Sequence, residues 1–136
     1  MLRLLLAVVL LPLLVSLGGC ATLGQRPEVA SALSVAPENC GKASWYGPGF
    51  HGKQTANQEI FDETAMTAAH RYLPFNTRLR VTDQRTGYSV VVRVNDRGPY
   101  ADNRIIDLSA KAANVLGFQN AGVTAVCIDI IDQPGA

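Results

Sequence analysis

The stretch Val91–Asp107, VVRVNDRGPYADNRIID, decides the fold expected for this chain. Its β-branched run predicts a strand. The Asn-Asp-Arg-Gly-Pro that follows predicts a tight turn, because Asp and Gly tolerate turn conformations and Pro fixes its own φ. A second short strand, Arg104–Leu108, then carries Asp107 in an apolar run. The guanidinium of Arg97 therefore lies beside the carboxylate of Asp96 at a strand end, either as a loop ion pair or as part of a functional site.

Further short strands flank this stretch on both sides. The runs that predict them are Lys42–Tyr46, Arg78–Thr82, Tyr88–Asn95 and Val123–Ile131, of which the middle two form a hairpin around Asp83–Gly87. Ser109 is placed to cap one short helix, Ala110–Leu116, which Gly117 ends. Six or so short strands with one or two short helices predict a mainly β fold, a small closed barrel.

The N-terminal segment is expected to target the protein and not to belong to the barrel. Residues 1–19 contain Arg3 and an apolar run too short for a membrane span, which predicts a signal peptide. Leu17-Gly18-Gly19-Cys20 resembles a lipobox, in which Cys20 is lipidated; an ordinary secretory signal or an uncleaved anchor is the alternative. Residues 20–39 read as a flexible tether, residues 40–132 as the domain and residues 133–136 as a tail.

Charge and cysteine content exclude several classes of function. Loss of Arg3 with the signal leaves 11 basic residues (12 less one) against 11 acidic ones, so no basic surface indicates nucleic acid binding. No cofactor motif is present, and His51 and His70 lack the spacing of a zinc site, so no metal is expected. Cys40 and Cys127 lie at the two ends of the domain in an exported chain, which favours a disulfide over two free thiols.

Several motifs in a fixed order carry a resemblance to a known family. They are ASWYG from Ala43, FHGKQTAN from Phe50 with Glu59 and Phe61-Asp62 after it, MTAAHRYLPFNT from Met66, and VNDRGPY with RIIDLS from Val94. From about Lys42 to Ile131 the chain resembles the RlpA-like (rare lipoprotein A) family. The resemblance implies a six-stranded double-psi β-barrel and an endolytic lytic transglycosylase that acts on peptidoglycan.

The resemblance also implies the site. It points to Glu59 and Asp96 as the catalytic carboxyl groups, with His70 assisting. Asp107 matches an acid of more distant barrel relatives and is the alternative. A general acid needs a raised pKa, which the neighbouring Arg97 would oppose at Asp96, so we expect Glu59 to be the acid and Asp96 to stabilise positive charge.

Two other features qualify this assignment. The family usually has Gly before the glutamate where this chain has Gln58. If that position needs a positive φ, Gln58 is strained by about 1 kcal/mol or more, or the loop shifts. Trp45 and Tyr46 end a strand and are candidates for a sugar-binding groove, although for Trp45 a place in the core is equally expected.

The expected function is cleavage of peptide-poor glycan strands to 1,6-anhydromuramic acid ends, in cell-wall remodelling or daughter-cell separation. The alternative is a non-catalytic, expansin-like module that binds peptidoglycan, and a structural lipoprotein is a second one. Peptidoglycan glycan strands are the expected partner, with divisome or cell-wall proteins as further candidates. The expected location is the cell envelope, with the lipid anchor in the outer membrane facing the periplasm.

Overall fold

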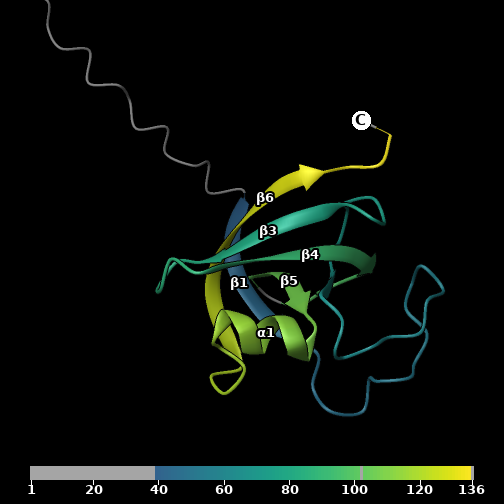
Figure 1. Cartoon of the computed structure of the whole chain (residues 1–136), viewed down its shortest axis with the longest axis horizontal. Coiled ribbons are helices and arrows are strands. Elements are labelled where there is room, and N and C mark those ends of the chain that lie inside the picture. Colours follow the sequence, from purple (N-terminus) through teal and green to yellow (C-terminus); the bar gives the residue numbers. More distant parts are fainter. Residues whose placement is uncertain (1–38, 102, 136) are drawn as a thin grey trace, which may run out of the picture. The chain divides into compact units, whose positions relative to one another are not determined.

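The computed structural model describes residues 39–101 and 103–135, which form a closed six-stranded barrel (Figure 1). The strands and the helix, in chain order, are β1 (Cys40–Trp45), β2 (Thr67–Ala69), β3 (Arg78–Asp83), β4 (Ser89–Asp96), β5 (Arg104–Leu108), α1 (Ala110–Leu116) and β6 (Val123–Asp132). They close in the order β1-β5-β2-β4-β3-β6. The predicted mainly β barrel is therefore confirmed. The predicted signal peptide and residues 20–38 of the predicted tether lie outside the described residues.

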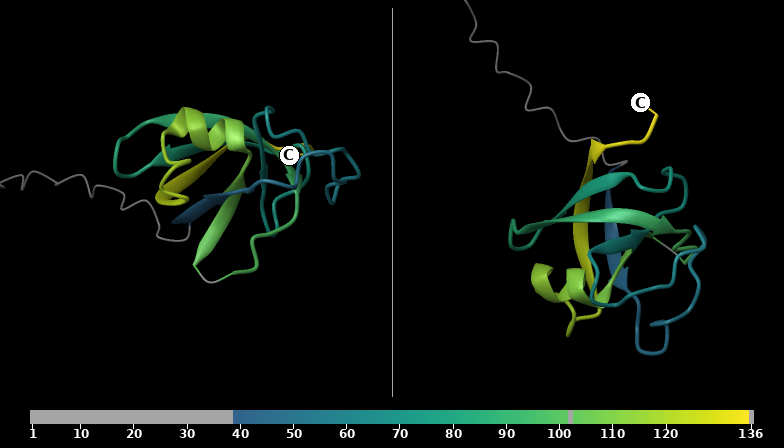
Figure 2. Two further views of the ribbon diagram at one scale, coloured as in Figure 1. Left: turned by 90° about the horizontal axis from the view of Figure 1, so that it is seen from below. Right: turned by 45° about the vertical axis from the view of Figure 1, so that its right-hand side comes forward.

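Two pairs of neighbouring strands are parallel, β1 with β5 and β2 with β4, while the other four pairings are antiparallel. Parallel neighbours cannot be joined by a tight hairpin, so the chain crosses between them by longer connections. The longest connection between consecutive strands is the loop of residues 46–66, which joins β1 to β2. Figures 1 and 2 show this loop beyond the barrel end to which β4 points, and so it lies where the candidate site residues gather.

β4 shows why the Val-rich run forms a strand and how it ends. Val90, Val92 and Val94 are buried in the barrel, as the period of two requires. The pairing of β4 with β2 shifts register between Ala68 and Ala69, so that Ala69 pairs with Asp96. Such an irregularity re-aims side chains at strand ends. This irregularity lies at the end of β4 that carries the carboxylate of Asp96.

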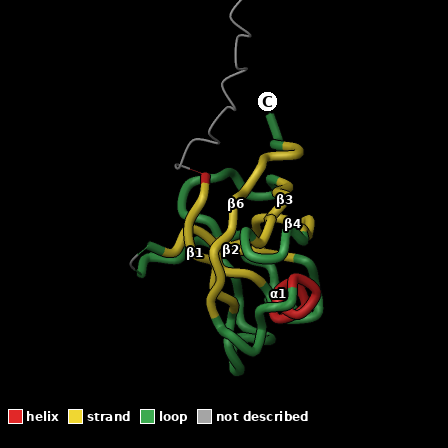
Figure 3. Tube along the Cα trace, turned by 90° about the vertical axis from the view of Figure 1, so that its left-hand side faces the viewer, coloured by secondary structure: helices red, strands yellow, loops and turns green. Residues whose placement is uncertain are grey.

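Helix α1 covers one side of the barrel (Figure 3). The Ser109 hydroxyl accepts a hydrogen bond from the amide of Ala112 at the helix start, and Gly117 ends the helix with φ 88°. Ala112, Ala113 and Leu116 are buried against the barrel. Within residues 39–101 and 103–135, no helix is long and apolar enough to cross a bilayer.

The large side chains that fill the barrel interior come from β3, β4, β5, β6, α1 and the loop after α1, while β1 and β2 contribute small buried residues such as Ala43, Ala68 and Ala69. The largest fully buried apolar side chains are Phe118, Leu79, Ile106, Leu108, Leu116, Val81, Val92, Val94 and Val126. The structure differs from the sequence prediction at β2. No strand is predicted at Thr67–Ala69 from the sequence, because a strand of three small residues has no readable alternation.

Candidate active site

Three segments that are distant in sequence meet at the end of β4. The amide of Asn57 donates to the Asn95 carbonyl at 3.3 Å, which docks the loop of residues 55–59 on the strand. The amide of His70, just after β2, donates to the Asp96 carbonyl at 3.2 Å. The structure thus brings the predicted residues Glu59, His70 and Asp96 to one end of the barrel.

The carboxylate of Asp96 accepts three hydrogen bonds. Its Oδ1 accepts from the amides of Ala56 and Arg97, both at 2.8 Å, and its Oδ2 accepts from the Tyr46 hydroxyl at 2.7 Å. Burial is the main cause that raises the pKa of Tyr46, and the hydrogen bond to Asp96 adds to it. Tyr46 therefore remains a neutral phenol that holds Asp96 in place.

Glu59 is fixed on the outer side of β4. Its two carboxylate oxygens accept from the two terminal nitrogens of Arg93, at 2.8 and 2.9 Å, and the Asn95 side-chain amide adds a bond at 3.3 Å. The hydrogen bonds from Arg93 are the main cause that lowers the pKa of Glu59 to about 2. This is the reverse of the raised pKa that our assignment of Glu59 as the general acid requires. In this conformation Glu59 is ionised throughout the neutral range.

Gln58 adopts a positive φ of 73°, as the comparison with the family pattern suggested. Its amide donates to the Thr55 carbonyl at 2.9 Å, and its own carbonyl accepts from the Gln54 side chain at 3.3 Å. The backbone therefore keeps a turn suited to glycine and carries a side chain there. The strain is concentrated on the residue next to Glu59.

Arg97 does not pair with the Asp96 carboxylate through its guanidinium, so of the two alternatives for this turn the loop ion pair is wrong. The guanidinium lies over the ring of Phe75, 3.8 Å from the ring centroid, and donates to the His70 carbonyl at 3.2 Å. Adjacent residues at a strand end point in different directions, and Arg97 finds an aromatic face more than twenty residues away in the chain. The guanidinium of Arg97 therefore stabilises the backbone around the site, while its amide donates to Asp96.

His70 is half-buried, and the Nδ1 edge of its ring is held by hydrogen bonds from the backbone. Its Nδ1 accepts hydrogen bonds from the amides of Tyr72 and Leu73, at 3.2 and 3.1 Å. Burial is the main cause that lowers the pKa of His70, and the charges of Arg97 and Arg71 add to it. A neutral ring with Nδ1 as acceptor carries its proton on Nε2.

Asp107 lies on β5 opposite Ser44 of β1. Its Oδ1 accepts from the Ser44 hydroxyl and, at 3.3 Å, from Arg104. The side chain is 17% exposed. The charge of Asp107 contributes to the raised pKa of Tyr46, which places it near the Asp96 cluster. Asp107 is therefore a separate carboxylate near Asp96, and its own hydrogen-bond partners are Ser44 and Arg104.

The two candidate groove aromatics point to different surroundings. Tyr46 binds Asp96, and its ring packs between those of Phe50 and Phe61, at centroid distances of 5.3 and 4.7 Å. Trp45 packs against the core, donates from Nε1 to the Gln119 carbonyl at 3.0 Å and borders a separate shallow hollow beside α1. Of the two, only Tyr46 lies at the carboxylate cluster.

The structure also shows where the two domain cysteines and His51 lie. A disulfide joins Cys40 to Cys127 across β1 and β6, as expected. His51 lies in the exposed loop, where its Nδ1 accepts from the Glu63 amide at 3.3 Å. No metal-binding group of three or more acidic, His or Cys residues occurs in the described part of the chain. Cys20 lies outside that part.

Sequence reasoning missed two groups that hold the site. Arg93, which binds Glu59, is an outward residue of β4 within the quoted stretch, and no pattern marks it as different from other strand arginines. Arg71 donates to the carbonyls of Pro99, Ala101 and Arg104, which fixes the loop between β4 and β5. Its only sequence signal is its place beside His70.

Comparisons with known proteins show the family to which this chain is similar. Residues 38–128 match the sequence model of the family described as "Lytic transglycolase". The probable endolytic peptidoglycan transglycosylase RlpA of Synechocystis sp. is 60% identical, over 79% of this chain and 38% of that protein. The endolytic peptidoglycan transglycosylase RlpA of Campylobacter jejuni is 46% identical, over 81% and 40% respectively. This chain thus spans about two fifths of the length of these relatives.

Solved structures show the same barrel in other settings. Apo Clavibacter michiganensis expansin matches with a TM-score of 0.54 and 26% identity, over 72% of this chain and 52% of that chain. The Streptomyces papain inhibitor matches with a TM-score of 0.55 at 22% identity, over 68% and 92%, which shows the fold alone.

The strand order of the closed barrel, the family match and the similar expansin structure define a double-psi β-barrel protein. Since the family match covers more than half of the sequence, the chain belongs to the lytic transglycolase family, and its relatives place it among the RlpA-like members.

Proposed function

We propose that this chain cleaves peptidoglycan glycan strands by endolytic, intramolecular transglycosylation. The observation that carries the proposal is the gathering of Glu59, Asp96 and His70 from three separate segments at the end of β4. Relatives at 46–60% identity are named for this activity. The proposed reaction needs a proton donor for the leaving oxygen and a base for the attacking hydroxyl, and one carboxyl group can serve as both.

The hydrogen bonds favour Asp96 for the proton-transferring role, in place of Glu59. Both oxygens of Glu59 face guanidinium or amide groups, which can only donate. Asp96 Oδ2 instead faces the Tyr46 hydroxyl, which can turn and accept if Oδ2 carries a proton. Asp96 is therefore the better acid and base, and the ionised Glu59 is suited to stabilise positive charge in the transition state.

The proposed step balances without water. Protonated Asp96 donates its proton to the glycosidic oxygen as the bond from C1 of the muramic residue to that oxygen breaks. The C6 hydroxyl of the same sugar then forms a bond to C1, and its proton returns to Asp96. The products are a shortened strand with a 1,6-anhydro end and a strand with a free C4 hydroxyl.

Digestion of purified, peptide-stripped glycan, with mass spectrometry of the products, tests the proposal. Products should end in 1,6-anhydromuramic acid, and reducing muramic ends alone would identify a hydrolase instead. Asp96→Asn and Glu59→Gln should each lower kcat by about two decades or more, because each group acts in the transition state. Both variants should still bind insoluble wall material. If they cleave at the wild-type rate while Asp107→Asn is inactive, Asp107 is the acid.

The main rival is a non-catalytic, expansin-like module that binds peptidoglycan. It is favoured by the shared barrel of the expansin structure and by Gln58 in place of the usual glycine, and it requires none of the carboxylates. Binding of wall glycan with no product release over long incubation would establish this rival.

Attachment to the outer membrane through a lipidated Cys20 is part of the same proposal, supported by Leu17-Gly18-Gly19-Cys20 after an apolar run. This location would place the domain in the periplasm beside wall glycan and beside divisome proteins. Cys20→Ala should release the protein from the membrane fraction. Wild-type protein that incorporates no labelled fatty acid and fractionates like the variant would disprove the anchor.

A further inference from the structure

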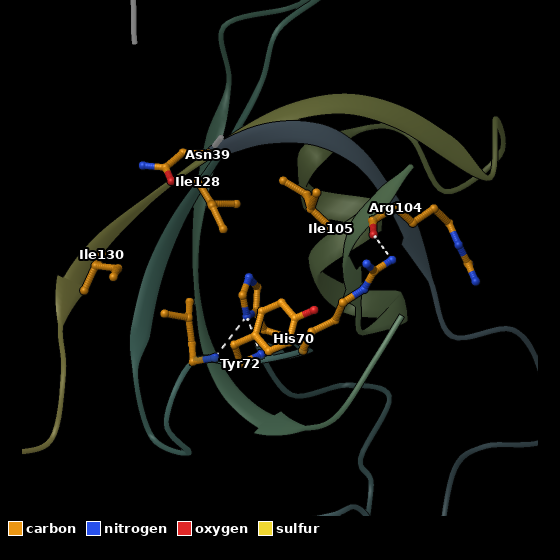
Figure 4. Close-up of a pocket in the computed structure, with 9 residues that line it drawn as sticks. Asn39, His70, Tyr72, Arg104, Ile105, Ile128 and Ile130 are labelled. Atoms are coloured by element: carbon orange, nitrogen blue, oxygen red, sulfur yellow. Dashed lines mark hydrogen bonds between the residues drawn. The ribbon is translucent and has the colours of Figure 1, made fainter. Parts of the chain in front are cut away.

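A cavity of about 230 Å³ lies beside His70, the residue that follows β2 (Figure 4). Its lining is largely apolar, with Leu73, Ile105, Ile128 and Ile130, and it also includes His70, Tyr72, Asn39, Arg71 and Arg104. Arg71 donates to backbone carbonyls of the neighbouring loop, and Arg104 donates to Asp107. Neither Glu59 nor Asp96 lines it, and His70 is the link to them through its backbone bond to Asp96. Pockets that enclose drug-sized ligands have roughly 300–1,000 Å³, so this one suits a single sugar or one of its substituents.

The His70 ring directs one N–H donor toward the apolar part of this cavity. Because Nδ1 accepts two backbone amides, the proton of the neutral ring is on Nε2. Figure 4 shows this second nitrogen directed toward the side of the cavity where Ile105 and Ile128 lie. No hydrogen bond from residues 39–101 or 103–135 reaches Nε2. A donor in apolar surroundings is suited to a ligand that brings a matching acceptor.

Tyr72 provides an exposed flat surface at the same cavity. Its ring is 83% exposed, and its backbone amide is fixed by His70. The two rings meet edge to face, with centroids 6.4 Å apart and an interplanar angle of 76°. An exposed aromatic face beside a small apolar cavity can pack on a sugar ring whose substituent enters that cavity.

We propose that this cavity binds the acetamido group of an N-acetylated amino sugar of the glycan strand. Nε2 of His70 donates to the acetyl carbonyl, Ile105 and Ile128 contact the acetyl methyl group, and the ring of Tyr72 packs on the pyranose face. The proposal rests on the proposed function, because it takes a wall glycan as the ligand. It assigns recognition of the acetyl group to a place distinct from the carboxylates that act on the glycosidic bond.

The chemistry of the cavity separates this ligand from other polysaccharides. A glucose unit has a hydroxyl where the amino sugar has its acetamido group. That hydroxyl carries no methyl group that could fill the cavity, and it would place an unpaired hydrogen-bond donor against the isoleucines. A difference of one small apolar group in a hydrophobic pocket changes binding by about 10-fold to 200-fold. We therefore expect at least about tenfold preference for acetylated strands.

Calorimetry on the full-length chain tests this preference. The probes are the hexamer of N-acetylglucosamine, its N-deacetylated form at high ionic strength, and cellohexaose. The acetylated hexamer should bind about tenfold or more tightly than either other hexamer. The ¹⁵N-imidazole NMR spectrum should show the Nε2 signal of His70 shifting with the acetylated hexamer alone. Equal affinity for all three hexamers, or an unchanged Nε2 signal at saturation, would overturn the proposal.

A matched pair of variants locates the site. Tyr72→Leu should weaken binding of the acetylated hexamer by about tenfold, because it removes the stacking face. Tyr88→Leu makes the same change at another exposed tyrosine, 69% exposed at the opposite end of β4, and should bind like wild type. Equal effects of the two variants would contradict the location.

The outcomes also separate this proposal from the activity itself. Cleavage of glycan without any preference for acetylated hexamers would refute the acetamido site and leave the proposed function standing. Acetyl-selective binding without cleavage would support the acetamido site and refute the proposed transglycosylase activity.

Discussion

Substitution of Gln58 by glycine tests how the loop that carries Glu59 is held. Gln58 has φ 73°, in the left-handed region that L-residues with a side chain occupy at a cost of about 1–2 kcal/mol. Glycine removes that cost but brings about 0.5–1 kcal/mol more backbone entropy to the unfolded chain. The net expectation is that Gln58→Gly raises the free energy of unfolding by about 0.5–1 kcal/mol.

Two controls separate backbone strain from side-chain contacts. Gln58→Ala shortens the side chain but keeps the strain, so its stability should lie within about 0.5 kcal/mol of wild type. Asn76 also has a positive φ, 70°, but its Oδ1 accepts a bond from Arg93 at 2.9 Å. Asn tolerates this conformation, so Asn76→Gly relieves little strain, loses the bond and should destabilise.

Thermal unfolding of the full-length chain and its variants is the assay. A change of about 0.5–1 kcal/mol in a domain of about 100 residues corresponds to roughly 2–8 °C in Tm. Glycan cleavage by Gln58→Gly should at least equal that of wild type, since the turn that presents Glu59 is kept. If Gln58→Gly unfolds at a lower temperature than Gln58→Ala, the strain argument is wrong.

Three further predictions concern the contacts that hold the site. Arg93→Gln should raise the pKa of Glu59 from about 2 toward the ordinary 4.5, and NMR titration of the carboxyl group would measure this change. Because the folded pKa of Glu59 is depressed, the stability that its ion pair contributes is present above about pH 4.5 and is lost as the pH falls toward 2. The side chains of Arg93 and Glu59 are 36% and 40% exposed, so the wild-type protein should lose less than about 1 kcal/mol of unfolding free energy over this pH range. Replacing both Cys40 and Cys127 by Ser should lower the free energy of unfolding by up to about 4–5 kcal/mol in denaturant titrations, because the disulfide closes a separation of 87 residues; an unchanged midpoint would contradict this. Arg71→Lys should speed amide exchange in the loop between β4 and β5 and lower kcat by about tenfold at unchanged pH profile, because lysine cannot bind three carbonyl groups at once; unaltered exchange would show that the loop does not depend on it.

The sequence predicted the elements whose residues alternate over several positions. Val90, Val92 and Val94 made β4 readable, and Ser109 with Gly117 marked the helix. β2 was not readable, because three small residues carry no period, although β2 is what brings His70 to Asp96. Where a strand has neighbours that are distant in sequence, only the pairing itself identifies it.

The site was predicted as a set of residues, but not as a set of contacts. Glu59, His70 and Asp96 came from the resemblance, and the positive φ of Gln58 from a departure within it. Which groups surround each carboxylate depends on side chains far along the chain, such as Arg93, 34 residues from Glu59. The low pKa of Glu59 therefore could not be read from its neighbours in sequence.

The loop of residues 55–59 couples the two carboxylates of the site. The amide of Ala56 donates to the side chain of Asp96. The amide of the next residue, Asn57, donates to the backbone of Asn95, whose own side chain binds Glu59. A shift of this loop would therefore remove a donor from Asp96 and move Glu59 at the same time. Asp96 has further support from the barrel, while Glu59 depends on an exposed ion pair that is worth only about 0–1 kcal/mol. The geometry of the turn at residue 58 is consequently the feature on which the relative placement of the two groups depends most.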